Sequence, residues 1–301
     1  MEVVRNLQLL ISSKKGMLDS IRERGGDIVG GLVDYPEAVR EIASKQPKFF
    51  KVKEGWKLGQ STIIPDITID LSDVTDGVNL FRNCCFQGEE NKTTEFTIDI
   101  STLIDCSYLM YDSYTYIGPY KRGWVSLFLE GGENITNLDY AFSNINGDTG
   151  IHRYIDIHLD YTKVKPTSMI CTFENSELVG ESRELWYTVN TEDVEDFTGC
   201  YRNSICMNTV VVNISSAKSI DEMFKGCTKE GEIYFFSDPS NIESMVDAFD
   251  INIGSSMPTL KYDYRYDYSH IIDKIVSGGK MNIMPMTESE LEYYLNIFPT
   301  W

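Results

Sequence analysis

The chain has 301 residues, and its 27 basic residues against 46 acidic ones give a formal net charge of −19. This length suffices for one large domain or for a repeat body with small additions. The acidic balance argues against a nucleic-acid partner, because binding to phosphates requires a basic face. The sequence has no apolar run long enough to cross a bilayer and no signal-peptide pattern at its start, so we expect no membrane insertion and folding in the cytoplasm.

Residues 1–44 predict two helices separated by glycines. Apolar residues recur near a heptad spacing in the first helix: Val4, Leu7, Ile11, Leu18 and Ile21. This seam is typical of a short coiled coil, although Gly16 leaves open that the segment splits into two helices. Asp34 and Glu37 form a capping box that begins the next helix at Tyr35 and Pro36. We interpret residues 1–44 as a helical anchor that makes the chain a homo-oligomer.

The order of these two helices resembles a short N-terminal segment of many structural proteins of tailed phages. The resemblance covers about Ser13 to Ile42, in KKGMLDSIRERGG followed by GLVDYPEAVREI. It departs from that family at residues 17–19, MLD, where small residues are usual. The resemblance implies a virion protein of an appendage, assembled in the host cytoplasm and bound to other virion proteins.

Residues 45–70 predict a basic linker followed by a first strand. Five lysines oppose Glu54 alone between residues 45 and 57: Lys45, Lys48, Lys51, Lys53 and Lys57. One interpretation is a solvated linker. The other is a docking patch at Lys48, Lys51 and Lys53 for an acidic neighbour, such as a second copy of this chain. The segment TIIPDITIDL, residues 62–71, then predicts the first strand.

One short pattern recurs seven times between residues 71 and 262. Each copy has a large apolar or aromatic anchor: Phe81, Met110, Phe142, Phe173, Tyr201, Phe224 and Phe249. An Asp, Asn or Ser stands five residues before each anchor: Asp76, Asp105, Asn137, Ser168, Asp196, Ser219 and Ser244. Such residues cap helices, and the Asn or Asp that follows most anchors suits a left-handed helix end. The pattern therefore predicts a short helix in each copy.

A segment rich in β-branched and aromatic residues follows each predicted helix. These segments are residues 96–100, 124–129, 154–159, 185–189, 209–214, 232–236 and 258–262. A unit of one helical turn and one strand cannot bury its apolar face alone, so the copies must stack. The prediction is an α/β fold, a solenoid of about seven short-helix-plus-strand repeats over residues 71–262. The loops of variable length would emerge on one side and build a binding surface there.

Two copies suggest a family for this solenoid. SIDEMFKGC at residues 219–227 and ITNLDYAFSN at residues 135–144 resemble the BspA-like leucine-rich repeats of bacterial surface proteins. The copies at Met110 and Tyr201 depart from that signature. The resemblance implies a leucine-rich-repeat-like solenoid that recognises proteins or surfaces without catalysis.

Two stretches are rich in tyrosine. The loop that follows the second anchor offers aromatic contact area with polar tips, and we expect it to bind a partner: Tyr111, Tyr114, Tyr116, Tyr120 and Trp124. The alternating tyrosines from Tyr262 to Tyr268 predict a strand that helps to close the solenoid. Residues 263–301 predict a helical C-terminal cap, with helices at residues 270–276 and 287–298 and a capping box of Thr287 and Glu290.

The sequence shows little that points to catalysis. The seven cysteines have no metal or redox spacing, so we expect small buried hydrophobic residues. A carboxylate pair such as Asp156 and Asp160 is easily found in an acidic chain and carries little weight. We therefore expect no enzyme, no cofactor and no metal.

Three classes of function remain open. The first is a virion appendage protein whose solenoid recognises other virion proteins or a host surface receptor. The second is an internal collar or tail-hub adaptor that contacts only virion proteins. The third is a polysaccharide-degrading appendage enzyme, against which the absent catalytic motifs count.

Overall fold

The computed structural model describes residues 49–53, 63–64, 68–88, 93–116, 123–147, 153–159, 163–178, 190–206, 209–229, 231–253, 257–278 and 280–298. The chain divides into two compact units, residues 1–49 and 50–301. The predicted anchor lies outside the described residues, with Val4, Leu7, Ile11, Leu18, Ile21, Tyr35 and Pro36. Lys48 and Tyr120 lie outside them as well.

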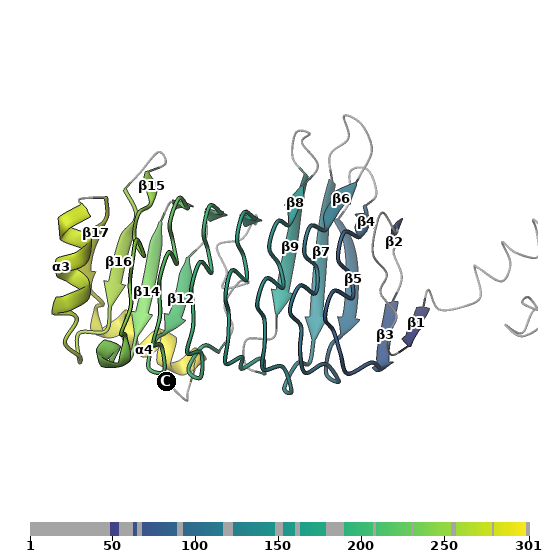
Figure 1. Cartoon of the computed structure of the whole chain (residues 1–301), viewed down its shortest axis with the longest axis horizontal. Helices are drawn as coiled ribbons and strands as arrows, with labels where there is room; N and C mark the ends of the chain where they lie inside the picture. The colour runs from purple at the N-terminus through teal and green to yellow at the C-terminus, as the bar shows by residue number, and fades with distance from the viewer. Residues whose placement is uncertain are drawn as a thin grey trace, which may run out of the picture. The chain divides into compact units, whose positions relative to one another are not determined.

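The second unit is a β-solenoid in which strands from successive turns pair side by side (Figure 1). Its long strands form two sheets. One has the order β1 (Phe49–Lys53), β3 (Thr68–Asp73), β5 (Thr93–Asp99), β7 (Gly123–Glu130), β9 (Arg153–Leu159). The other has the order β12 (Val210–Asn213), β14 (Glu232–Phe236), β16 (Thr259–Tyr262), β17 (Asn282–Pro285). The pairs from β3 to β9 and from β12 to β17 are parallel. The predicted solenoid is confirmed.

Short parallel strands form two further sheets that the sequence did not predict. One contains β2 (Ile63–Ile64), β4 (Cys85–Gln87), β6 (Tyr114–Tyr116) and β8 (Asn146–Gly147). The other contains β10 (Glu177–Leu178), β11 (Ile205–Cys206), β13 (Thr228–Lys229) and β15 (Asn252–Ile253). The single first strand predicted at residues 62–71 is wrong, because β2 and β3 belong to different sheets.

The polar residues before the anchors form one ladder along the solenoid. Each pairs with its counterpart in the next turn through a parallel bridge: Asp76, Asp105, Asn137, Ser168, Asp196, Ser219 and Ser244. The sequence therefore identified equivalent positions correctly. We call the segment from this polar residue to two residues beyond the anchor the turn column.

The turn column contains turns where the sequence predicted helices. In the described residues between 68 and 262 the one helical element is the 3-10 helix η2 (Pro239–Asn241). In five of the seven copies the polar residue accepts a hydrogen bond from the N–H two positions later, as Asp105 does from Ser107 at 2.8 Å, which starts an Asx-turn. Because Asp, Asn and Ser begin both structures, their side chains did not distinguish a cap from a turn. The predicted helix-plus-strand unit is wrong.

Two left-handed residues in each of the first six turns, and Asp247 alone in the seventh, prevent a helix. They lie two positions before and two after the anchor, as at Tyr108 and Asp112, both with φ of 56°. An α-helix needs consecutive right-handed residues, so it cannot continue through either position. The Asn column was correctly assigned to left-handed backbone, and Gly226, with φ of 66°, takes the same role after Phe224.

The backbone N–H groups of the turn column alternate between two kinds of partner. Leu80 donates to the Gly77 carbonyl of its own turn at 3.1 Å, whereas Phe81 donates to Leu109 of the next turn at 2.8 Å. Leu109 and Met110 repeat this alternation with Cys106 and Ala141. The anchors thus bind one turn to the next through the backbone, and so does left-handed Asn79, which donates to the Ser107 carbonyl at 3.2 Å.

At Ser168 and Ser244, an acidic side chain of the preceding turn helps to hold the polar residue. Asp139 Oδ1 accepts hydrogen bonds from Ser168 Oγ at 2.6 Å and from the Ile170 N–H at 2.8 Å. Asp221 serves Ser244 in the same way, at 2.7 Å. Burial raises the pKa of Asp139 despite these two hydrogen bonds.

The anchors lie in the core, as predicted. Four of their rings stack in sequence, with centroids 5.6 Å apart for Phe142 and Phe173, 5.4 Å for Phe173 and Tyr201, and 5.2 Å for Tyr201 and Phe224. Each ring except Phe249 is buried, as is Met110. The long strands alternate, so that Phe96 and Ile98 of β5 face the core while Glu95 is exposed. The anchors and the long strands therefore share one apolar interior.

The C-terminal segment differs from the predicted helical cap. Helix α3 (Ser269–Gly278) contributes Ile271 and Ile275 to the core, but β17 then adds a parallel strand beside β16. The tyrosine strand predicted to reach Tyr268 is also wrong, since β16 ends at Tyr262. Tyr268 instead turns inward and donates to the Ser237 carbonyl at 2.7 Å.

Helix α4 (Glu288–Ile297) covers the outer face of the sheet. Its residues Leu291 and Tyr294 pack with Val211 of β12 and with Tyr234 and Phe236 of β14. The capping box predicted at Thr287 and Glu290 is present. The expectation that both helices close the end of the solenoid is wrong. Helix α4 lies on the sheet face instead, because the outward-facing aromatic residues of β14 form an apolar surface there. Within the described residues, the helices are too short or too polar to cross a bilayer.

Candidate functional site

The predicted aromatic loop is divided by the structure. Tyr111 lies in the turn column, and Tyr114, 37% exposed, begins β6. Tyr116 lies in β6 and Trp124 in β7, but their side chains are outside the described set. The same holds for Lys51 and Lys53 of β1, so the docking patch stays a prediction. Tyr111 therefore gives the starting point for a site.

Tyr111 belongs to a cluster of three tyrosines and one arginine drawn from successive turns. The Arg82 guanidinium lies 4.8 Å from the Tyr111 ring centroid and 5.8 Å from that of Tyr108. Tyr108 stacks on Tyr140 with centroids 4.7 Å apart and planes 3° from parallel. All four side chains are half-buried. We call Arg82, Tyr108, Tyr111 and Tyr140 the aromatic ladder.

The turn column determines the geometry of this ladder. Tyr108 and Tyr140 are equivalent, each two residues before its anchor and each with φ of 56°. Adjacent turns are joined by the Tyr108 N–H, which donates to the Asp139 carbonyl at 2.9 Å. The spacing of 4.7 Å between the rings matches the usual separation of paired strands, about 4.8 Å. The two rings therefore stack because the turns do.

Left-handed backbone is unusual for tyrosine. A bulky residue at positive φ is an outlier, and asparagine or glycine takes this conformation at lower cost. The equivalent position in the first copy is Asn79, whose side chain accepts a hydrogen bond from Arg82 at 3.1 Å. The next two copies carry tyrosine in spite of the backbone, which points to a use for the rings beyond folding.

Farther along the same column, charged side chains replace the aromatic ones. Arg202 forms ion pairs with Glu174 at 2.6 Å and Glu222 at 2.5 Å. Lys225 continues the series with Glu222 at 2.5 Å and Asp247 at 3.1 Å. We call Glu174, Arg202, Glu222, Lys225 and Asp247 the ion-pair ladder. Every charge in it has a partner within it, as a structural role requires.

Cys171 joins the two ladders. A hydrogen bond with Cys171 raises the pKa of the Tyr140 hydroxyl to about 12. On the other side, Arg202 Nη2 lies 3.5 Å from Cys171 Sγ. Burial raises the pKa of this thiol to about 11, so it stays protonated and unreactive at neutral pH.

The other candidate residues that the structure describes are buried or stacked on a neighbour. The six cysteines whose side chains the structure describes are buried, as expected: Cys84, Cys85, Cys106, Cys171, Cys200 and Cys227. His158 stacks on Phe128 with centroids 4.2 Å apart. The side chains of Asp156 and Asp160 lie outside the described set. The described part of the chain contains no group of acidic, histidine and cysteine side chains suited to a metal ion.

Sequence reasoning found Tyr111 but missed Arg82, Tyr108 and Tyr140. A signal was present in the columns, because Arg82 and Tyr111 each follow an anchor directly, while Tyr108 and Tyr140 each precede one by two residues. Stacking successive turns would have placed these side chains together. The prediction instead followed the local density of tyrosine along the chain.

Comparison with family models, curated proteins and solved structures gives no match. The likeness to BspA-like repeats and to phage structural proteins therefore rests on the quoted motifs alone.

Proposed function

We propose that this chain is a non-catalytic recognition protein whose solenoid binds a macromolecular partner through the aromatic ladder. The observation that carries the proposal is the stack of Tyr108 on Tyr140 beside Arg82 and Tyr111, half-buried on successive turns. Tyrosine and arginine are the residues that most often dominate binding energy at interfaces. Rings held in a stack lose little further freedom when a partner covers them.

The partner that we favour is a surface protein of a host cell or another protein of a virus particle. This narrower proposal rests on the phage-like sequence at residues 13–42, which implies a virion appendage protein, and on the BspA-like repeats, which imply protein or surface recognition. In it, residues 1–44 anchor the chain in an appendage as a homo-oligomer, and the leucine-rich-repeat-like solenoid makes the contact. An internal collar or hub adaptor is the second candidate, because the same ladder would serve a contact within the particle.

The test measures binding of the labelled full chain to intact cells of the organism in which the sequence occurs and to particles from its cultures. The double variant Tyr108→Ala with Tyr140→Ala should lose at least tenfold in affinity, which corresponds to about 1.4 kcal/mol. Tyr293→Ala is the matched control, since Tyr293 is 59% exposed on α4, away from the ladder. Binding to cells supports host recognition, and binding to particles alone supports the adaptor. Binding that survives the double variant would overturn the proposal.

A further inference from the structure

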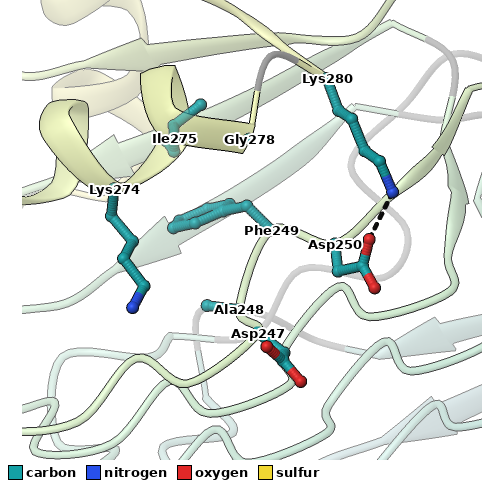
Figure 2. Close-up of a pocket in the computed structure, with 8 residues that line it drawn as sticks. All are labelled: Asp247, Ala248, Phe249, Asp250, Lys274, Ile275, Gly278 and Lys280. Carbon is teal, nitrogen blue, oxygen red and sulfur yellow. Dashed lines mark hydrogen bonds and ion pairs between the residues drawn. The ribbon is translucent and has the colours of Figure 1, made fainter.

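A cavity of about 160 Å³ opens where the turn column ends against α3. Figure 2 shows the Phe249 ring between Lys274 and Ile275 of α3 and the turn residues Asp247 and Ala248. Lys280 and Asp250 form an ion pair at one side of the same cavity. We call this space the end cavity.

Phe249 is the last ring of the anchor stack. Its neighbours are Phe224, with centroids 6.3 Å apart, and Phe235, at 6.1 Å. Phe224 is fully buried, whereas Phe249 is half-buried and lines the end cavity. In the described residues no aromatic ring of a further turn covers Phe249, and α3 leaves a gap over it. The end cavity therefore offers an aromatic face of the kind that the solenoid elsewhere covers with its own rings.

The charges around the end cavity balance. Two carboxylates, Asp247 and Asp250, and two ammonium groups, Lys274 and Lys280, line it. Asp250 forms an ion pair with Lys280, and Asp247 forms one with Lys225, which lies outside the cavity. Lys274 has no ion-pair partner among the described residues. A strongly anionic or cationic ligand would meet a group of its own sign here, whereas hydroxyl groups can donate to the carboxylates and accept from the ammonium groups.

We infer that the end cavity binds one neutral sugar unit, either a free monosaccharide or the terminal residue of a glycan. The volume suits a single small ring, and the C–H face of a sugar can lie on Phe249 while its hydroxyls reach Lys274 and Asp247. This site lies at the opposite end of the turn column from Arg82. It does not depend on the aromatic ladder.

Saturation-transfer NMR on the full chain tests this inference, with the methyl glycosides of glucose, galactose, mannose and N-acetylglucosamine as probes. We expect transfer to at least one glycoside, strongest at its ring C–H protons. Phe249→Leu keeps an apolar side chain and removes the aromatic face, and Lys274→Met removes the charge from an exposed residue. Each should weaken binding about tenfold or more, by loss of stacking and of hydrogen bonds respectively.

Two control variants match these changes. Tyr293→Leu removes an exposed aromatic residue elsewhere, and Asp273→Asn changes an exposed residue of α3 that does not line the cavity. Both should bind as the native chain does, as should the double variant at Tyr108 and Tyr140. The inference is wrong if none of the four glycosides shows transfer or if transfer persists in both cavity variants.

Discussion

The aromatic ladder and the ion-pair ladder occupy the same backbone column but use it differently. Tyr108 and Tyr140 in one ladder and Glu222 and Asp247 in the other all lie two residues before an anchor, and all four have left-handed backbone. The turns that carry them make the same pattern of backbone hydrogen bonds. In the ion-pair ladder each charged group forms an ion pair with another member of the ladder, either in its own turn or in a neighbouring one. In the aromatic ladder, side chains with half-exposed faces stack across turns. One scaffold thus carries a surface that is complete in itself and another that a partner can complete.

The largest expected effect tests what the two surfaces share. Phe142→Ala, in the turn of the aromatic ladder, and Phe224→Ala, in the turn of the ion-pair ladder, should each lower the free energy of unfolding by about 3–5 kcal/mol. Both rings are fully buried, and removal of either leaves a cavity in one stack. Urea denaturation followed by circular dichroism measures the loss. A cost confined to one of the two variants would show that the anchors do not form a common core.

The next prediction compares how much the arginine of each ladder contributes to stability. Arg202→Met leaves the Glu174 carboxylate, whose side chain is 13% exposed, without its partner in the ladder, and it leaves Glu222 with Lys225 alone. We expect a loss of about 1–3 kcal/mol, the usual cost of leaving a poorly hydrated polar group unpaired. Arg82→Met removes only contacts with tyrosine faces and one amide, so the loss should be about 0.5–1 kcal/mol. Equal losses in urea denaturation would remove the distinction between a structural and a binding ladder.

The two ladders should also respond at opposite ends of the pH scale. Hydrogen bonds from Lys225 and Arg202 lower the pKa of Glu222 from its ordinary value of 4.5. Its contribution to stability is therefore present above pH 4.5 and lost as pH falls through the lower value of the folded state. The pKa of Tyr140 is raised from 10.0 to about 12, mainly by its hydrogen bond with Cys171. Its contribution is present below pH 10 and lost as pH rises toward 12.

Melting temperatures across the pH range check both arms. Glu222→Gln should flatten the acid side of the profile relative to the native chain, and Tyr140→Phe should flatten the alkaline side. Glu243→Gln, at an exposed glutamate outside both ladders, is the control for the acid arm. If Tyr140→Phe instead alters only the acid side, the hydrogen bond with Cys171 does not hold the tyrosine in its neutral form.

The sequence predicted the register of the solenoid but not its unit. The column from Asp76 to Ser244 was found because each turn needs a short polar side chain at that point. The sequence shows this directly, since every copy has Asp, Asn or Ser there. Whether such a side chain begins a helix or an Asx-turn depends on the left-handed residues that follow, among them Tyr108, Tyr140, Cys171 and Glu222. Their residue types give no hint of positive φ, because neighbouring turns impose it through backbone hydrogen bonds. The short strands β4, β6 and β8 were missed for the same reason, since they too exist only where turns stack.

Only one residue of the aromatic ladder was predicted from the sequence. Tyr111 was identified from aromatic density, but its neighbours Arg82 and Tyr140 stand 29 residues away on either side, and only the stacked turns bring this group together. The end cavity was not predicted at all. It depends on how α3 packs against the last turn, and a helix pattern gives no such packing.

The smallest effect on stability should accompany a large effect on binding. Tyr108→Asn places at a left-handed position a residue that tolerates it, which relieves a backbone cost of about 1 kcal/mol. The same change removes the stack on Tyr140, a loss of about 0.5–1.5 kcal/mol. The two terms offset each other, so thermal unfolding should shift little, while partner binding falls at least tenfold. Glu222→Asn, at the equivalent position of the ion-pair ladder, should do the reverse, because Arg202 and Lys225 each lose one of their two ion pairs while the tyrosine surface is unchanged. A strongly destabilised Tyr108→Asn variant would show that the aromatic ladder mainly stabilises the fold, and it would contradict the proposal that the ladder is a binding surface.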